Sequence, residues 1–563
     1  MSRLFKRHDK RKVFSLDGLW KFKTDISKKG IDEKWYQNFP NNCEDMVVPS
    51  CWNNELGLYD YEGLAWYMTT FSTVSKNICI SFGAVTGQAE VYLDGVRLGE
   101  HYGGFTGFDF LVKDLVPGVH ALVVAVDNTH DNMNTIPLSK VDWFHYGGIY
   151  RSVEIAELGA AWIKNYHIDY KLDAYLNNVS LSINLCLESF IPEVATKKLN
   201  IYIDGKSYYC ENLDVLGESS VNITSIELKN IQLWDIGKPN LYNISFEIED
   251  DDITERMGFR QIKVENRKLL LNGREIFVKG VNRHEDHPDW GFAVPLKLMK
   301  KDIDIIRNLG CNAIRGSHYP NSEVFLDYLD QQGLLFWEEI PMWGYPEEPL
   351  KNSIILERGL KMHEEMVTRD YHHPCIIIWS MHNEIDTRTQ AAYDITKAFT
   401  EKVRSLDQTR PLSFASMFPL EDICFPLVDI ISVNKYFGWY YDEIKTWDIF
   451  LKQLNEKQKN EGLENRPIII SEFGAAALYG DSTLEGPKWT ENYQEKLLKY
   501  TLNLFYDYPG VVGTYIWQYC DMRTAKELEL GRARSFNNKG LLNEYRKPKL
   551  SYWTVQKIYN KIK

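Results

Sequence analysis

The chain has 563 residues, of which 44% are hydrophobic and 25% are charged. This composition is typical of a soluble globular protein with several domains, and it excludes disordered and fibrous chains. The net charge of −13 provides no basic footprint for nucleic acid. No apolar run approaches the roughly 18 residues that a membrane-spanning helix needs.

Targeting and redox patterns indicate a cytoplasmic location. The basic segment 1–12 is not followed by the apolar core of a secretory signal. Nine cysteines are scattered without a Cys-x-x-Cys pair. This pattern favours reduced, buried thiols over disulfides or a zinc site. We therefore expect a cytoplasmic protein.

The first two blocks of the chain have the pattern of β structure. In residues 1–157, Val91 and Leu93 alternate with a polar-edged neighbour up to Asp94-Gly95, a hairpin signal. We expect a β-sandwich there. Residues 158–264 contain further strand-like runs and few helical periods, and the length of this block suits an immunoglobulin-like sandwich.

Residues 265–563 change to an alternation of short apolar runs and stretches with helical spacing. Met299, Ile303 and Ile306 are an example of the helical spacing. The apolar runs are 276–280, 313–315, 334–337, 376–379, 412–415, 430–433, 468–470 and 511–517. Eight strand-like runs with helices between most of them predict a C-terminal (β/α)₈ barrel.

Two carboxylates follow strands of this predicted barrel. Glu384 comes after the fourth run and Glu472 after the seventh. Either glutamate alone would be read as a solvated strand end, but active sites of such barrels lie at the C-terminal ends of the strands. A pair of carboxylates there suits glycoside hydrolysis, in which one is protonated and the other ionised.

A metal-dependent hydrolase is an alternative. His284 and Asp286 follow the first strand, in a segment crowded with histidine and acids. Their spacing fits no standard ligand pattern, so we expect no metal site.

The chain resembles glycoside hydrolase family 2, the group of β-galactosidases and β-glucuronidases, over nearly its whole length. The motifs are Leu16–Trp20, the stretch 91–104, Met257–Arg260, Gly280–Glu285 and Ser317–Pro320. The resemblance implies a jelly-roll-type, sugar-binding-type sandwich before the immunoglobulin-like domain and the barrel. It also implies a retaining mechanism with Glu384 as acid/base and Glu472 as nucleophile. Relatives of this kind often form tetramers or dimers.

Three stretches resemble β-glucuronidases in particular. They are Asn537-Asn538-Lys539, Asn434–Tyr440 and Asp142-Trp143-Phe144. An ammonium and an amide satisfy a uronate, whereas a neutral sugar would leave the lysine unpaired. An isolated Asn-x-Lys arises often by chance, but this one follows the eighth strand.

The resemblance implies an exo-acting β-glucuronidase and assigns roles around the sugar. Asn537 and Lys539 bind the carboxylate, Asn383 holds the 2-hydroxyl, and Tyr436 orients the nucleophile. His318 and Asp142 contact sugar hydroxyls. We also expect substrate contacts from Asn434, Tyr440 and Trp517.

Metal and cofactor are not expected. Large family-2 β-galactosidases bind magnesium through a Glu-x-His after the third strand, and Glu338-Glu339-Ile340-Pro341 has no such histidine. No cofactor is required by the implied mechanism. The sequence leaves open whether a flavin binds away from the active site.

Departures from the family pattern leave the identity of the preferred sugar undecided. Ile385 follows Glu384 where proline is usual, Ala476 replaces an aspartate, and the arginine expected at 533 is alanine, flanked by Arg532 and Arg534. A β-galacturonidase or β-galactosidase is therefore an alternative, and a non-catalytic carbohydrate-binding protein is a weaker one. The short segment 341–370 predicts an open site that accepts larger leaving groups or sugar chains.

Overall fold

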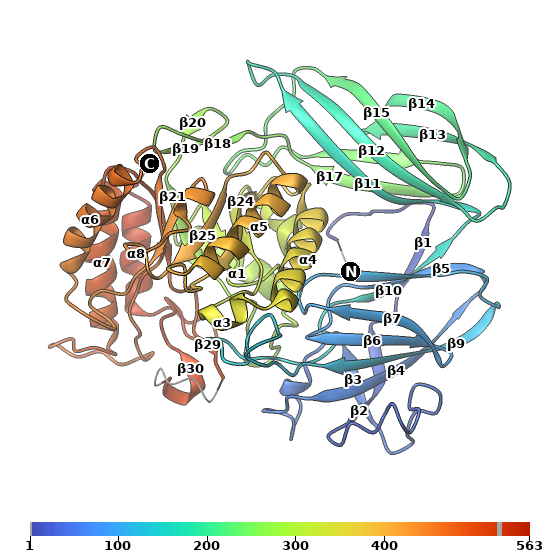
Figure 1. Cartoon of the computed structure of the whole chain (residues 1–563), viewed down its shortest axis with the longest axis horizontal. Helices are drawn as coiled ribbons and strands as arrows, with labels where there is room; N and C mark the ends of the chain where they lie inside the picture. The colour runs from blue at the N-terminus through green and yellow to red at the C-terminus, as the bar shows by residue number, and fades with distance from the viewer. Residues whose placement is uncertain (1–2, 526–531, 563) are drawn as a thin grey trace.

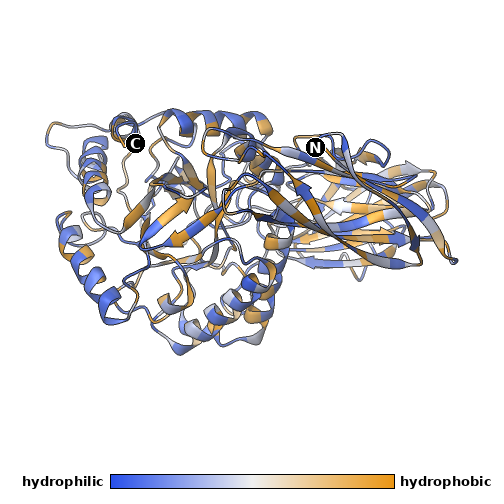
Figure 2. Ribbon diagram, turned by 90° about the horizontal axis from the view of Figure 1, so that it is seen from above, coloured by the Kyte–Doolittle hydropathy of each residue, from blue (hydrophilic) through white to orange (hydrophobic). Residues whose placement is uncertain are grey.

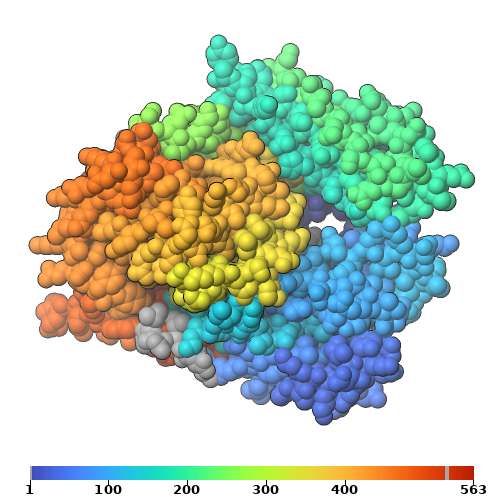
Figure 3. All heavy atoms as spheres, in the orientation of Figure 1, coloured from blue at the N-terminus to red at the C-terminus, as the bar shows by residue number. Residues whose placement is uncertain are grey.

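The structure is a computed structural model that describes residues 3–525 and 532–562. Two β-sandwiches stack beside an α/β barrel, which holds the C-terminal half of the chain (Figure 1). The space-filling view shows both sandwiches in contact with the barrel (Figure 3). In the described part of the chain, no helix combines the length and apolarity needed to cross a membrane.

The N-terminal sandwich consists of two antiparallel sheets. One sheet has the order β1 (Lys12–Ser15), β10 (Val153–Leu158), β5 (Asn77–Phe82) and β8 (Phe108–Val112). The other has the order β3 (Glu44–Val48), β2 (Gly18–Thr24), β4 (Leu64–Thr73), β9 (Gly118–Asp127), β6 (Gln88–Leu93) and β7 (Val96–Tyr102). The predicted hairpin at Asp94-Gly95 joins β6 and β7, with φ of 51° and 78°. Positive φ at both residues matches the twist of the flanking strands.

The second sandwich follows directly. One sheet contains β11 (Ala161–Leu172), β12 (Val179–Ser189) and β15 (Glu218–Leu228). The facing sheet contains β14 (Lys206–Val215), β13 (Ala195–Ile203), β16 (Tyr242–Glu247) and β17 (Asp252–Met257). Alternate residues of β13, including Leu199 and Ile201, are buried, as expected for strands that cover a core with one face.

A small sheet leads from this sandwich into the barrel. It contains β18 (Ile262–Glu265), β19 (Lys268–Leu271) and β20 (Arg274–Glu275). Eight parallel strands then close the barrel: β21 (Val278–Asn282), β22 (Ala313–Arg315), β23 (Leu335–Glu339), β24 (Ile376–Asn383), β25 (Leu412–Ser416), β26 (Ile431–Asn434), β27 (Ile468–Glu472) and β28 (Val511–Ile516). The predicted barrel is confirmed.

Helices surround the strands and present their polar faces to solvent (Figure 2). They are α1 (Leu296–Asn308), α2 (Glu323–Gln332), α3 (Glu347–Leu350), α4 (Ser353–Asp370), α5 (Gln390–Leu406), α6 (Thr446–Asn460), α7 (Glu491–Asp507) and α8 (Leu550–Tyr559). Gly333 ends α2 in the left-handed conformation with φ of 63°, which places the chain for β23.

β24 is longer than the predicted run, which ended at Trp379. Ser380, His382 and Asn383 continue the strand and are fully buried. Nε2 of His382 is hydrogen-bonded to the Thr396 hydroxyl at 2.9 Å. A prediction based on apolar runs misses strand residues that are polar and point into the barrel, so it made this strand too short.

The segment between β9 and β10 links the first sandwich to the barrel mouth. The Tyr146 hydroxyl donates to Asp286 at 2.8 Å, and Arg151 donates to Glu285 at 2.9 Å. These buried contacts hold Asp142, from the same segment, over the C-terminal ends of the barrel strands.

Candidate active site

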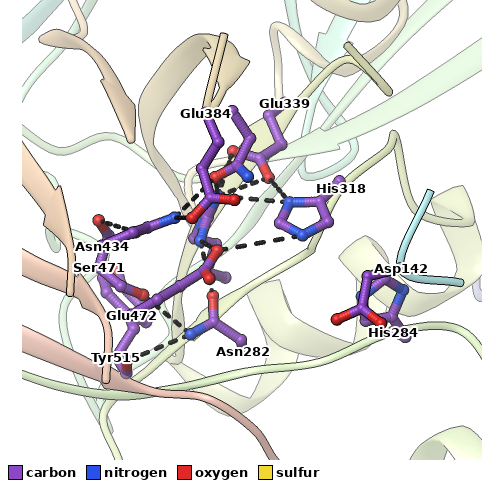
Figure 4. Close-up of polar contacts among 12 residues, drawn as sticks. Asp142, Asn282, His284, His318, Glu339, Glu384, Asn434, Ser471, Glu472 and Tyr515 are labelled. Atoms are coloured by element: carbon purple, nitrogen blue, oxygen red, sulfur yellow. Dashed lines mark hydrogen bonds and ion pairs between the residues drawn. The ribbon is translucent and has the colours of Figure 1, made fainter. Parts of the chain in front are cut away.

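Two glutamates lie at the barrel mouth, as the strand ends predict. Glu472 is the last residue of β27, and Glu384 follows β24 directly. Figure 4 shows both side chains extending into the same region, with Asn434 and His318 beside them. Glu384 has a left-handed φ of 55°, and its amide donates to the carbonyl of Ala415 at 2.9 Å. Such backbone strain in a non-glycine residue is typical of functional sites.

Glu472 is held between a cation and a hydroxyl. Arg315 Nη1 donates to Oε1 at 2.8 Å, and the Tyr436 hydroxyl donates to Oε2 at 2.7 Å. Burial raises the pKa of Glu472, whereas both of these donors oppose the rise. Both carboxylate oxygens are therefore fixed and their charge is stabilised.

Glu384 has a different environment. Among the described residues, the neutral amide of Asn434 donates to its side chain at 2.9 Å. Burial and the negative charge of Glu472 raise the pKa of Glu384 to about 8. Glu384 is accordingly protonated at neutral pH. The negative charge of Glu472 is better stabilised, because Arg315 and Tyr436 donate to it. This is the division that acid/base chemistry between two carboxyl groups requires.

Arg315 and Asn383 connect the two glutamates. Arg315 Nη2 donates to Asn383 Oδ1 at 2.7 Å and to Glu339 at 2.8 Å. Asn434 donates to the same Asn383 oxygen at 3.1 Å. The buried Asn383 Nδ2 has no hydrogen-bond partner among the described residues. It is therefore a donor available to a ligand hydroxyl.

His318 lies beside both Glu339 and Glu472. Its Nδ1 is 2.7 Å from Glu339, its Nε2 is 4.0 Å from Glu472 Oε1, and its ring stacks on Trp517 at 5.1 Å. Burial and the Arg315 charge lower the pKa of His318 well below its ordinary value, so the ring is neutral. Donation from Nδ1 to Glu339 leaves Nε2 as an acceptor.

A second polar cluster contains the predicted Asn-x-Lys residues. Lys539 Nζ donates to the Tyr440 hydroxyl at 2.6 Å, and Asn537 donates to Asp142 Oδ2 at 2.7 Å. Arg532 completes the cluster through bonds to Asp142 at 2.5 Å and to Tyr440 at 3.2 Å. We call these five residues the cation cluster.

Arg532 was not among the predicted site residues. The sequence shows only that the expected arginine at 533 is missing, and the structure brings its neighbour Arg532 into the cluster. In the sequence, the arginines on either side of position 533, Arg532 and Arg534, were the signal that could have indicated this role. Arg534 instead pairs with Glu544 at 3.0 Å.

The cation cluster has an excess of positive charge. Lys539 is buried, and its Nζ lies 4.6 Å from the ring centre of Tyr440 and 5.6 Å from that of Tyr436. Burial and the Arg532 charge lower the pKa of Lys539, whereas the charges of Asp142, Glu472 and Glu384 oppose them. Within the cluster two basic side chains share one carboxylate, so an anionic ligand would stabilise the ammonium form of Lys539.

The residues considered for a metal have other partners. Asp286 accepts from the Tyr146 hydroxyl, and His284 Nδ1 lies 3.2 Å from the Tyr319 hydroxyl. In residues 3–525 and 532–562, the ligand atoms of Asp330, His373 and Cys375 lie within 4.8 Å of one another. Cys375 precedes β24, so this group lies at the end of the barrel away from the two glutamates.

The closed (β/α)₈ barrel has paired carboxyl groups at its C-terminal mouth, the arrangement that glycoside hydrolysis requires. Residues 262–563 match the model of the TIM barrel domain of glycosyl hydrolases family 2, and residues 161–260 match a second family-2 model. The chain belongs to glycoside hydrolase family 2 and is a hydrolase.

Similar proteins include enzymes named for two different uronic acids. A family-2 β-galacturonidase from Eisenbergiella tayi, solved with galacturonate, is 34% identical, with a TM-score of 0.92 and full coverage of both chains. A β-glucuronidase from Ruminococcus gnavus is 26% identical, with a TM-score of 0.86 and 99% coverage of both chains. A curated β-glucuronidase from Paenibacillus borealis is 27% identical over 96% of this chain and 95% of the relative. Glycosides are therefore the substrate class.

Proposed function

We propose that the enzyme is a retaining, exo-acting β-hexuronidase that removes a terminal β-D-hexuronic acid, with glucuronides as its first expected substrates. The observation that carries the proposal is the cation cluster beside the two glutamates. Lys539 and Arg532 share the Tyr440 oxygen, and Asn537 is held by Asp142. A neutral hexose would leave Lys539 and Arg532 with the Asp142 carboxylate as the one anion of the cation cluster.

In the proposed mechanism, the uronate carboxylate binds to Lys539 and Asn537. Glu472 attacks the anomeric carbon while Glu384 gives its proton to the glycosidic oxygen, and the aglycone leaves as an alcohol. Glu384, now ionised, removes a proton from water, which attacks the glycosyl ester and releases the sugar with retained configuration.

Further residues stabilise this reaction. Tyr436 and Arg315 fix the two oxygens of Glu472, so the attacking oxygen is preorganised. The free Nδ2 of Asn383 suits the 2-hydroxyl, where hydrogen bonds strengthen in the oxocarbenium-like transition state. His318, Asp142 and Trp517 complete the proposed sugar site.

A β-galacturonidase is the second candidate, favoured by the likeness to the Eisenbergiella tayi enzyme. Both sugars carry the carboxylate that the cation cluster suits, and they differ in configuration at C4. The departures at Ala476 and Ala533 give no preference by themselves.

The test is hydrolysis of p-nitrophenyl β-D-glucuronide, β-D-galacturonide and β-D-galactoside in the presence of EDTA. Cleavage of a uronide with at least about 100-fold preference over the galactoside supports the proposal. Preference for the galacturonide would select the second candidate. Cleavage of the galactoside alone would refute carboxylate recognition, and loss of activity with EDTA would revive the metal-dependent alternative.

A further inference from the structure

If the proposed function holds, the position of the substrate's leaving group in the active site follows from the position of Glu384. A general acid must contact the glycosidic oxygen, so the aglycone lies beside Glu384. Glu384 follows β24, which lies between β23 and β25, and Asn434 at the end of β26 donates to Glu384 at 2.9 Å. The segments that follow β23, β25 and β26 therefore form the walls of the aglycone site.

These walls combine apolar surface with partial exposure. Trp343, after β23, is half-buried and bridges to Asn383 through its backbone. Met417, after β25, and Tyr441, after β26, are each 38% exposed. Half-exposed apolar and aromatic side chains suit the faces of a sugar or an aryl group.

Lys435 is a half-buried cation in this region. It follows β26 between Asn434, which binds Glu384, and Tyr436, which binds Glu472. Its amide donates to the carbonyl of Glu472 at 3.1 Å, and its Nζ lies 5.6 Å from the ring centre of Tyr441. Within the described part of the chain, its ammonium has no ion pair or hydrogen bond.

Lys435 is separate from the cation cluster. The charge of Glu384 acts on both lysines, but Glu421 and Asp442 act on Lys435, whereas Arg532 and Asp142 act on Lys539. Glu421 and Asp442 are exposed, so water and salt screen them. Glu384 carries a proton before the reaction, because its pKa is about 8. The ammonium can therefore accept an anion at neutral pH.

We propose that Lys435 binds a carboxylate of the leaving group, so that the preferred substrates are uronides linked to a second acidic sugar. The apolar walls formed by Trp343, Met417 and Tyr441 contact the ring of that sugar, and Lys435 selects its charge. A partly desolvated ammonium that contacts the Tyr441 ring but has no ion pair or hydrogen bond among the described residues favours an anion over a neutral group of the same shape.

The experiment compares two uronides that differ in one charge. One uronide has 4-hydroxybenzoate as its leaving group, and the other has the methyl ester of that acid. The hydrolysis of each uronide is measured with the wild-type enzyme and with Lys435→Met. We expect the variant to lower kcat/KM for the acid by about tenfold and for the ester by less than about threefold. Lys435→Arg restores most of the preference, because it keeps the charge.

Controls separate the possible failures. Lys397→Met removes an exposed lysine of α5, and its ratio of acid to ester hydrolysis should equal that of wild type. Cleavage of the ester by wild type tests the proposed function independently. The same comparison of an acidic with a neutral leaving group is then made with two disaccharides, uronosyl-glucuronic acid and uronosyl-glucose.

Two results would overturn the inference. One is an unchanged acid-to-ester ratio in Lys435→Met. The other is an equal loss on both substrates together with a shifted alkaline limb of the pH profile, which would make Lys435 a positioning residue that acts through Glu384. Thermal unfolding of each variant shows whether the fold is intact.

Discussion

Arg532 and Asp142 form a bidentate ion pair across 390 positions of sequence, with Nε–Oδ1 and Nη2–Oδ2 distances of 3.1 and 2.5 Å. Asp142 comes from the first sandwich, and Arg532 from the segment after β28. The pair therefore joins the two domains at the proposed sugar site. It also positions Asn537, which donates to the same aspartate oxygen as Arg532 Nη2.

Arg532→Met should lower kcat/KM for the preferred aryl uronide by about 100-fold, because it removes one cation and releases Asp142 next to the uronate. Arg534→Met is the matched control, since Arg534 pairs with Glu544 and its side chain is 59% exposed. We expect at most a twofold effect there. Equal effects of the two substitutions in steady-state kinetics would show that Arg532 has no special role in the site.

Removing each glutamate should give a different product with azide. Glu472→Ala should lose about 10⁴-fold or more in kcat, and azide should then restore turnover as the α-glycosyl azide, formed on the vacated face. Glu384→Ala should keep activity on substrates with activated leaving groups and give the β-glycosyl azide. Product configuration by NMR checks both assignments, and an α-azide from Glu384→Ala would reverse them.

Sequence reasoning reaches the fold and the position of the two glutamates at the barrel mouth because both depend on local patterns. The Asp94-Gly95 turn, the eight apolar runs and the carboxylates at two strand ends are readable from neighbouring residues. The partners of Asp142 are not readable in this way, because Arg532 lies in a segment without periodicity. Arg315 was visible as a strand-end residue, but only the packed barrel shows that it bonds to Glu472, Glu339 and Asn383 together.

The alkaline limb of kcat/KM should report Glu384. Its pKa is raised to about 8, and the protonated form is the active acid. Activity should therefore hold below that pH and fall as pH rises through it. The limb should weaken with a 2,4-dinitrophenyl uronide, whose departure needs no proton. An unchanged limb with that substrate would assign the titration to another group.

Stability should depend on Arg3, which joins the N-terminal segment to the second sandwich and to the barrel. Its guanidinium donates to Glu255 at 2.9 Å and to Asp327 at 2.9 Å, and all three side chains are at most 5% exposed. Arg3→Met leaves two buried carboxylates without this partner, which should cost about 3–5 kcal/mol. Lys6→Met is the control, because Lys6 and its partner Asp9 are both 74% exposed.

The pH dependence gives the sign of this contribution. Burial raises the pKa of Glu255, but Arg3 and other cations outweigh it, so the pKa of Glu255 is well below its ordinary value. Stability from this ion pair is therefore present above the unfolded pKa and lost as pH falls toward the folded one. In urea unfolding followed from pH 7 to 4, the midpoint difference between wild type and Arg3→Met should narrow toward acid. A difference that widens toward acid would contradict the assignment of the ion pair.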